Sequence, residues 1–222
     1  MEQIKVIITG TTGMVGEGVL LECLSSPQVS GVLSVSRKPQ GMSHPKLKEY
    51  VVRDFLDLPE DDKMLKGYDA CFFCAGVSSI GMSEADYTRI TYDTTIHFAK
   101  VLAAQNPQMT FVYVSGAGTD GTEKSRLMWA RVKGRTENAL LRLPFRRVHN
   151  FRPGFMKAIP GQKYALRMYK FVAWMFPLLK MVFPNSVSTL SQVAGAMIKC
   201  ATTDVDKPVM EVSDINRLGT AN

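Results

Sequence analysis

Three glycines spaced three residues apart lie between the first apolar segment of the chain and the helical pattern that follows it. They stand in the run Thr9-Gly10-Thr11-Thr12-Gly13-Met14-Val15-Gly16. Glycines in this arrangement allow a tight turn, a close approach of phosphate to the backbone, and close packing of helix on strand. The start of the helix adds free N–H groups and the positive end of its dipole. We therefore predict a dinucleotide-phosphate site formed by Gly10, Thr12, Gly13, Met14, Val15 and Gly16.

Two cations follow the second predicted strand, at the place that decides between NAD and NADP. In NAD-preferring sites an acidic residue about 20 residues after the glycines binds the ribose hydroxyls. Here the chain reads Ser36, Arg37, Lys38. A guanidinium can hold the extra phosphate of NADP, and an ammonium can add a point charge. These residues favour NADP(H) as the cofactor, with NAD(H) possible, although a solvated strand end has the same composition.

Apolar runs and helical patterns alternate over residues 4–152. Short, β-branched or apolar runs predict six buried parallel strands: Ile4–Thr9, Val32–Ser36, Tyr50–Arg53, Asp69–Ala75, Thr110–Ser115 and Val148–Arg152. Helices are predicted after the glycines, over residues 84–104 and over residues 125–141. This alternation implies right-handed crossovers and an α/β fold with a doubly wound parallel sheet.

The pattern changes after Gly154. Residues 155–222 contain a Met- and aromatic-rich helical stretch, a second helical pattern at 191–201 and a short strand at 209–212. We interpret residues 1–222 as one domain in which 155–222 form a small helical lobe on the substrate side.

Charge is divided unevenly along the 222 residues. Residues 1–120 carry 10 Lys and Arg against 14 Asp and Glu, a net charge of −4, whereas residues 121–222 carry 17 against 6, a net charge of +11. Between Lys124 and Lys199 the one acid is Glu137, among 15 bases. The basic half could attract nucleotide phosphates, an anionic substrate or an anionic membrane. Nucleic acid is not expected, because no recognised binding module accompanies the charge.

Composition excludes several classes of protein. With 45% apolar and 21% charged residues, the chain can bury an ordinary core. No apolar run is long enough for a membrane span, and no collagen or coiled-coil pattern is present. The four cysteines lack the spacing of a disulfide scaffold, and no secretion signal precedes the first strand. We expect a cytoplasmic protein with reduced thiols and no metal site.

The segment from Tyr164 to Phe183 is aromatic, basic and broken by Pro177. It has two interpretations. One is a helix pair that closes the substrate cleft or forms a dimer face. The other is a peripheral membrane contact, in which apolar residues enter the interface and the bases meet anionic lipid.

These motifs together resemble the atypical branch of the short-chain dehydrogenase/reductase superfamily, and are similar to the Tat-interacting-protein-like and epimerase-like oxidoreductases. The resemblance covers residues 4 to about 157. It implies a Rossmann fold, a nicotinamide cofactor and an oxidoreductase or epimerase-like activity on a small carbonyl or alcohol. It also implies cofactor contacts in three further turns. The first contains Asp54 and Phe55, the second Cys74, Ala75 and Gly76, and the third Pro153, Gly154 and Phe155.

The resemblance further implies a catalytic serine and a Tyr-x-x-x-Lys pair. Ser115 ends the fifth predicted strand, and the pair is matched by Trp129 and Lys133, which share a helix face at this spacing. Lysine would hold the nicotinamide ribose. An indole N–H donates a hydrogen bond but exchanges no proton at useful pH, so Trp129 cannot replace tyrosine. Thr91 stands where the family has a helix asparagine.

The tryptophan leaves three alternatives open. The protein binds NADP without turnover, as a sensor or scaffold; or another acid replaces the tyrosine; or water and Ser115 deliver the proton. The candidate acids are Tyr113, Tyr87, Tyr92, Tyr164 and Tyr169. By analogy with the family, a homodimer would pair through the helices at 84–104 and 125–141.

Overall fold

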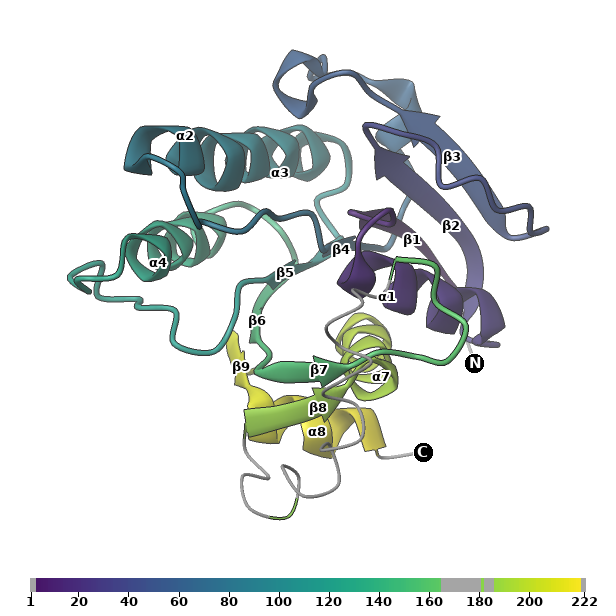
Figure 1. The fold of residues 1–222 in the computed structure, drawn as a ribbon. Coiled ribbons are helices and arrows are strands. Elements are labelled where there is room, and N and C mark those ends of the chain that lie inside the picture. The colour runs from purple at the N-terminus through teal and green to yellow at the C-terminus, as the bar shows by residue number, and fades with distance from the viewer. Residues whose placement is uncertain (1–2, 165–180, 182–185, 221–222) are drawn as a thin grey trace.

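A parallel sheet of seven strands runs through the part of the chain that the computed structural model describes, residues 3–164, 181 and 186–220. The strand order is β3-β2-β1-β4-β5-β6-β9, and every neighbouring pair is parallel (Figure 1). The strands are β1 Ile4–Thr9, β2 Val29–Ser36, β3 Leu47–Val51, β4 Ala70–Phe73, β5 Thr110–Val114, β6 Arg147–Arg152 and β9 Val209–Glu211. The chain leaves β1 toward β3 and returns to β4 on the other side of β1. The crevice above β1 and β4 is therefore the switch point at which such sheets bind ligands.

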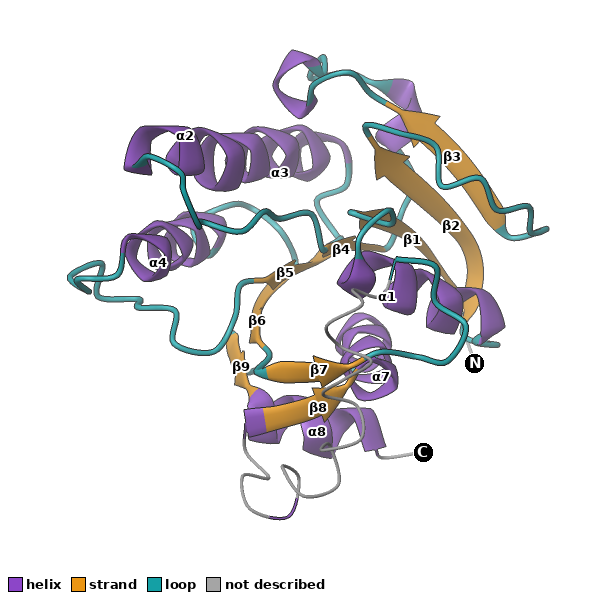
Figure 2. Cartoon of the chain, viewed as in Figure 1, coloured by secondary structure: helices purple, strands orange, loops and turns teal. Residues whose placement is uncertain are grey.

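Helices cover both faces of this sheet, as Figure 2 shows. One face carries α1 Met14–Ser25, α7 Leu190–Thr202 and α8 Val212–Thr220. The other carries α2 Glu84–Thr88, α3 Thr94–Gln105 and α4 Met128–Leu140. A π-helical turn, Arg89–Asp93, joins α2 to α3, and two 3-10 turns cover Phe55–Asp57 and Lys63–Leu65. A separate two-stranded parallel sheet pairs β7 Phe155–Lys157 with β8 Val187–Thr189.

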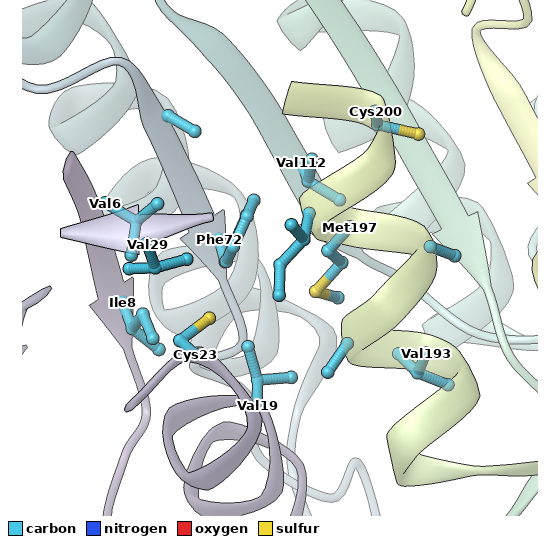
Figure 3. Close-up of a cluster of buried hydrophobic side chains, with 14 of the residues drawn as sticks. Val6, Ile8, Val19, Cys23, Val29, Phe72, Val112, Val193, Met197 and Cys200 are labelled. Carbon is cyan, nitrogen blue, oxygen red and sulfur yellow. The ribbon is translucent and has the colours of Figure 1, made fainter. Parts of the chain in front are cut away.

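Side chains alternate between the two faces of the sheet along each strand, and each face has its own hydrophobic core. On β1, Val6 and Ile8 face one core and Ile7 faces the other, because successive side chains point to opposite faces. Figure 3 shows the first core, where Val19 of α1 and Met197 of α7 meet the strand side chains. Full burial of such an apolar side chain contributes roughly 1.5–3 kcal/mol to the stability of the fold. This burial holds in place the sheet that carries the glycine loop.

The predicted α/β fold is confirmed, with shifts at element ends. The third strand is Leu47–Val51 rather than 50–53, because Asp54 begins a 3-10 turn: its carboxylate accepts from the backbone N–H of Leu56 at 3.0 Å. The helix predicted from 125 begins at Met128, because the backbone N–H of Ser125 donates to the carboxylate of Asp120 at 2.6 Å.

The C-terminal part is more closely joined to the sheet than its sequence pattern indicates. β9 is the seventh strand, beside β6, and α7 packs on α1, where a Cβ on Gly18 would come within 2.7 Å of Leu190. The sequence reasoning missed β7, β8 and α8. The helix pair or membrane contact predicted for 164–183 lies outside the described residues apart from Tyr164 and Met181. No helix in the described ranges is long and apolar enough to cross a membrane.

Candidate functional site

The glycine loop after β1 forms a cradle that requires glycine at positions 10 and 16. Gly10 has a φ of +71°, and a Cβ there would lie 2.7 Å from the backbone nitrogen of Ala75. A Cβ on Gly16 would lie 2.2 Å from the carbonyl oxygen of Gly10. Gly13 donates its N–H to that same oxygen at 2.9 Å. The loop therefore packs tightly against itself and against the end of β4.

Thr9 holds the two strand ends together above the switch point. Its Oγ1 accepts the backbone N–H groups of Cys74 and Ala75, both at 3.1 Å. Gly13 precedes α1 and has no side chain to cap it, so the first-turn N–H groups of α1 are available to an anion. The cradle thus has the backbone donors that a pyrophosphate requires.

Glu17 lies in the first turn of α1, where a carboxylate would oppose a phosphate. Its carboxylate is instead hydrogen-bonded to the backbone of residues 163–164. Its two oxygens accept the backbone N–H groups of Lys163 and Tyr164, each at 2.7 Å. Gln162 also donates its side-chain amide to the carbonyl of Met14 at 2.7 Å. These contacts join 162–164 to the start of α1.

A cavity of about 330 Å³ lies beside the cradle, over the ends of β2 and β4. This volume is at the lower end of the range of small-molecule sites. Five of the residues predicted to contact the cofactor line it: Arg37, Asp54, Phe55, Ala75 and Gly76. The other predicted contacts do not line it: Lys38, Cys74, the six residues of the glycine loop, Ser115, Lys133, Pro153, Gly154 and Phe155. Lys38 is exposed, and its carbonyl accepts from the hydroxyl of Ser36 at 2.6 Å.

Two arginines in this cavity escaped the sequence reasoning. Arg53 comes from the turn after β3 and Arg89 from the π-helical turn, and both line the cavity with Arg37. Asp54 and Asp86 are the acids in the lining, so the cations exceed the carboxylates. Arg53 is adjacent in sequence to Asp54, which was the available signal, whereas nothing local to Arg89 connects it to this cavity.

The serine and lysine predicted to be catalytic meet where β5 ends. Lys133 lies on α4 and donates from Nζ to the backbone carbonyl oxygen of Ser115. Burial lowers the pKa of Lys133, and the carboxylate of Glu137 offsets part of this effect. The hydroxyl of Ser115 donates to Oε1 of Glu137 at 2.5 Å. Ser115, Lys133 and Glu137 therefore form one contiguous polar cluster.

Glu137 is the functional candidate that the sequence reasoning missed. Its side chain is 2% exposed and pairs with Arg152, whose Nη2 lies 2.5 Å from Oε2. Arg152 also donates to Glu211 on β9 at 3.1 Å. Two signals were present in the sequence: Glu137 is the one acid between residues 124 and 199, and it follows Lys133 by four residues.

Trp129 occupies the same face of α4, four residues before Lys133. Its indole ring packs against the turn after β5, where a Cβ on Gly118 would lie 3.2 Å from Cη2 of the ring. Gly118 has a φ of +87°. The ring is half-buried, so the tyrosine position of the family is filled by a side chain wedged against the loop that follows Ser115.

The alternative proton donors differ in access. Tyr113 and Tyr87 are buried, and burial raises the pKa of both phenols, so neither reaches a substrate from its present position. Tyr92 packs under Arg135, whose guanidinium carbon lies 4.2 Å from the ring centre. Tyr164 lies beside Lys163. Tyr169 lies outside the described residues.

The turn after β6 is held against the turn after β5. The carbonyl of Pro153 accepts the N–H of Ala117 at 2.9 Å. A Cβ on Gly154 would lie 2.2 Å from the carbonyl oxygen of Ser186, and Phe155 pairs with Val187 in the small sheet. Contact of these residues with a nicotinamide stays a prediction.

A glycine cradle before α1, a cavity over the switch point and a lysine beside the Ser115 turn define a nicotinamide-dinucleotide-binding protein of the Rossmann type. Residues 6–131, more than half of the chain, match the NAD dependent epimerase/dehydratase family, and the chain belongs to that family. The resemblance to atypical short-chain dehydrogenases is thereby confirmed.

Curated relatives support this assignment. Leucinostatins biosynthesis cluster protein T of Purpureocillium lilacinum is 31% identical over 62% of this chain, and the match spans 51% of that protein. Protein fmp52, mitochondrial, of Emericella nidulans is 30% identical over 78% of this chain and 74% of its own length. Protein HTATIP2 of Rattus norvegicus is 27% identical over 76% of this chain and 72% of its own.

Solved structures agree on the fold. MoeE5, described in complex with UDP-glucuronic acid and NAD, superposes with a TM-score of 0.68 over 94% of this chain and 76% of its own. At 18% identity, this likeness shows the fold alone.

The cytoplasmic expectation is wrong. Several of the relatives are named as mitochondrial proteins, among them FMP52 of Debaryomyces hansenii, which matches 95% of this chain. Reduced cysteines without a recognised secretion signal favoured the cytoplasm. Neither observation separates the cytoplasm from another reducing compartment.

Proposed function

We propose that this protein is an NADP(H)-dependent oxidoreductase or epimerase-like enzyme that acts on a small carbonyl or alcohol. The observation that carries the proposal is the donation from Nζ of Lys133 to the carbonyl of Ser115, because it brings the two catalytic candidates together at the carboxyl end of β5. When bound, the dinucleotide supplies hydride transfer. The protein's own residues bind, orient and exchange protons.

The preference for NADP rests on the arginines of the cavity. Arg37 and Arg53 follow neighbouring strands and line one volume, so their guanidinium groups can share a phosphate. The carboxylate of Asp54 accepts from its own turn at Leu56. An adenosine ribose with an added phosphate suits this lining better than one with free hydroxyls.

Ser115 and Lys133 have separate roles in the proposal. Lys133 keeps its ammonium at the turn after β5, where it can also donate to ribose hydroxyls. Ser115 is buried and its hydroxyl donates a hydrogen bond to Glu137, so the lone pairs of its oxygen are left to accept from the O–H of an alcohol that reaches this turn. Ser115 thus orients the substrate oxygen.

A second candidate function is a non-catalytic NADP-binding regulatory or interaction protein. Trp129 favours it, because an indole wedged against Gly118 cannot transfer the proton that a tyrosine would. The two functions share the cofactor site and differ in turnover.

Turnover by matched variants separates the two candidates. Wild type, Trp129→Tyr and Lys133→Met are assayed with NADPH against a panel of small aldehydes and ketones, and with NADP⁺ against the matching alcohols. Activity in wild type that falls at least 100-fold in Lys133→Met supports the enzyme. Activity only in Trp129→Tyr supports the regulatory protein. Inactivity of both wild type and Trp129→Tyr, with NADPH still bound, contradicts the catalytic proposal.

The names of the relatives also support a mitochondrial location for this chain. Fractionation of cells that express a tagged protein tests this inference: co-purification with mitochondrial markers is expected, and recovery only in the soluble cytosolic fraction would contradict it. Homodimerisation and membrane contact stay predictions.

A further inference from the structure

A second basic groove lies at the opposite end of the strands from the dinucleotide cradle. It has a volume of about 380 Å³ and is formed where β1, β2 and β3 begin, at the end of the sheet marked by the N-terminus in Figure 1. Four lysines line it: Lys5, Lys46, Lys48 and Lys66. Its remaining lining is Ser30, Gly31, Val32, Pro45, Gly67 and Tyr68, so no carboxylate is part of it.

This concentration of lysines occurs in the acidic half of the chain. Residues 1–120 hold 10 bases against 14 acids. Four of those ten bases line the groove, and three more, Arg37, Arg53 and Arg89, line the nucleotide cavity. The bases of this half are therefore gathered at two hollows, one at each end of the strands.

The ammonium groups of the groove lysines form no ion pair with a described carboxylate, although the backbone N–H of Lys5 donates to Oδ2 of Asp69 at 2.7 Å. Among the ion pairs of the described residues, none includes any of the four. Lys46 donates to the carbonyl of Ser26 at 2.8 Å, which keeps its charge uncompensated. The stem of Lys5 lies beside Gly31, where a Cβ would meet its Cγ at 3.7 Å. Cations held around one hollow repel one another, and a bound anion relieves that repulsion.

Protection of an exposed sheet edge against pairing with other chains does not explain all four groove lysines. Lysines on an edge strand discourage pairing with other chains. β3 is an edge strand, which accounts for Lys48 on it and Lys46 directly before it. Lys5 lies on β1, two strands inside that edge. Lys66 lies in the turn before β4. These two lysines need another reason to face the same hollow.

We propose that this groove is a second anion site, which binds a phosphate-bearing ligand. The ammonium groups supply point charges suited to phosphate oxygens, and the hydroxyls of Ser30 and Tyr68 line the same space. The shared chemistry is that of a polyphosphate or of a phosphorylated lipid headgroup. The site does not depend on the proposed function, because it lies at the other end of the strands.

Calorimetric titration with inorganic tripolyphosphate tests the site. All titrations use an Arg37→Gln/Arg53→Gln background, which weakens phosphate binding in the nucleotide cavity, and the groove and control variants are compared within this background. Adding Lys48→Gln and Lys66→Gln is expected to weaken binding at least tenfold, about 1.4 kcal/mol. Arginine at both positions should retain binding. Lys63→Gln/Lys100→Gln is the matched control, because it removes two exposed cations of the same half that do not line the groove.

Two results would overturn the proposal: no binding of tripolyphosphate to the background protein, or equal weakening in the groove variant and the control, which would show diffuse charge attraction. Co-sedimentation with phosphatidylcholine vesicles that contain phosphatidylinositol bisphosphate then separates the two sources. Retention that requires Lys48 and Lys66 supports a lipid headgroup. Tripolyphosphate binding without retention supports a soluble ligand.

Discussion

Glu137 connects three elements of the fold through one buried carboxylate. It lies on α4, accepts from Ser115 at the end of β5 and pairs with Arg152 at the end of β6. Breaking a buried ion pair by removing one partner leaves an uncompensated charge, at a cost of roughly 3–5 kcal/mol. Glu137 therefore stabilises the same turn that positions the catalytic candidates.

Replacing Glu137 by glutamine should lower the free energy of unfolding by about 3 kcal/mol, because Arg152 loses its buried counter-charge. Glu84→Gln is the control, since the Glu84–Arg131 pair lies at the surface, with side chains 53% and 28% exposed, and such pairs contribute less than about 1 kcal/mol. Urea unfolding measures both. Equal effects of the two variants would show that the Glu137 cluster has no special part in stability.

Single residues differ in how far the sequence could define their roles. Ser115 and Lys133 could be paired because the resemblance implies a catalytic serine and a Tyr-x-x-x-Lys pair, and the structure does bring them together. Glu137 and Arg152 meet only through the packing of α4 on β6, a contact between residues 15 positions apart that no local pattern encodes. Arg89 likewise reaches the cavity through the π-helical turn.

At the scale of elements, the glycine loop must both close its backbone turn and leave room for a phosphate, and different glycines meet these two requirements. Gly10 and Gly16 are needed for the backbone to close, because a Cβ on either would overlap backbone atoms. Gly13 has only the carbonyl oxygen of Gly10 near its open side, at 3.4 Å. A methyl group at Gly13 would therefore fit the protein and instead occupy the approach of a phosphate.

Gly13→Ala is expected to weaken NADPH binding at least tenfold while changing the free energy of unfolding by no more than about 1 kcal/mol, the range of helix N-cap substitutions. Gly16→Ala should lose both stability and binding. Fluorescence titration and urea unfolding give the two readouts. Wild-type affinity in Gly13→Ala would show that phosphate does not enter at this loop.

The turn before α4 depends on the carboxylate of Asp120. The hydroxyl and N–H of Thr122 and the N–H groups of Lys124 and Ser125 donate to it, and these bonds lower its pKa from 3.8 to about 2. A lowered carboxyl pKa means that stability is present above the unfolded value of 3.8 and is lost as pH falls toward 2.

The difference in melting temperature between wild type and Asp120→Asn should therefore be constant above about pH 5 and shrink as the pH falls through the titration range of Asp120. Thermal denaturation monitored by circular dichroism over a pH series measures it. A difference that persists unchanged at the lowest pH would mean that the charge of Asp120 does not hold this turn.

Elements with strong periodicity were predictable and short ones were not. The buried strands β1, β4 and β5 have continuous apolar runs, and their positions were confirmed within two residues. β7 and β8 have three residues each, too few to show alternation, and they exist because they pair with one another. α8 begins directly after β9, so the sequence between them has no turn signal.

At the scale of the whole molecule, charge is arranged about the two ends of one sheet. The cradle and its arginines lie where the strands end, and the lysine groove lies where they begin. The basic excess of residues 121–222 was visible in the sequence. The two hollows in the acidic half were not, because they gather bases from strands that are distant along the chain.

Cofactor binding should stabilise the whole fold, because the cradle joins β1, α1 and the end of β4. NADPH at 100 times its dissociation constant is expected to add about 2.7 kcal/mol to the free energy of unfolding. Chemical denaturation with and without NADPH measures this effect, with AMP at the same concentration as a control. No change at saturating NADPH would contradict binding to the folded state.

The central claim is a nicotinamide-dinucleotide site that favours NADP(H). Tryptophan fluorescence titration with NADPH, NADH and their oxidised forms tests it directly, because Trp129 lies on the helix face that carries Lys133. We expect saturable NADPH binding with NADH at least tenfold weaker, about 1.4 kcal/mol, and loss of this difference in Arg37→Gln/Arg53→Gln. Equal affinities for NADPH and NADH in the wild type would contradict the NADP preference. No binding of any of the four would contradict the site itself.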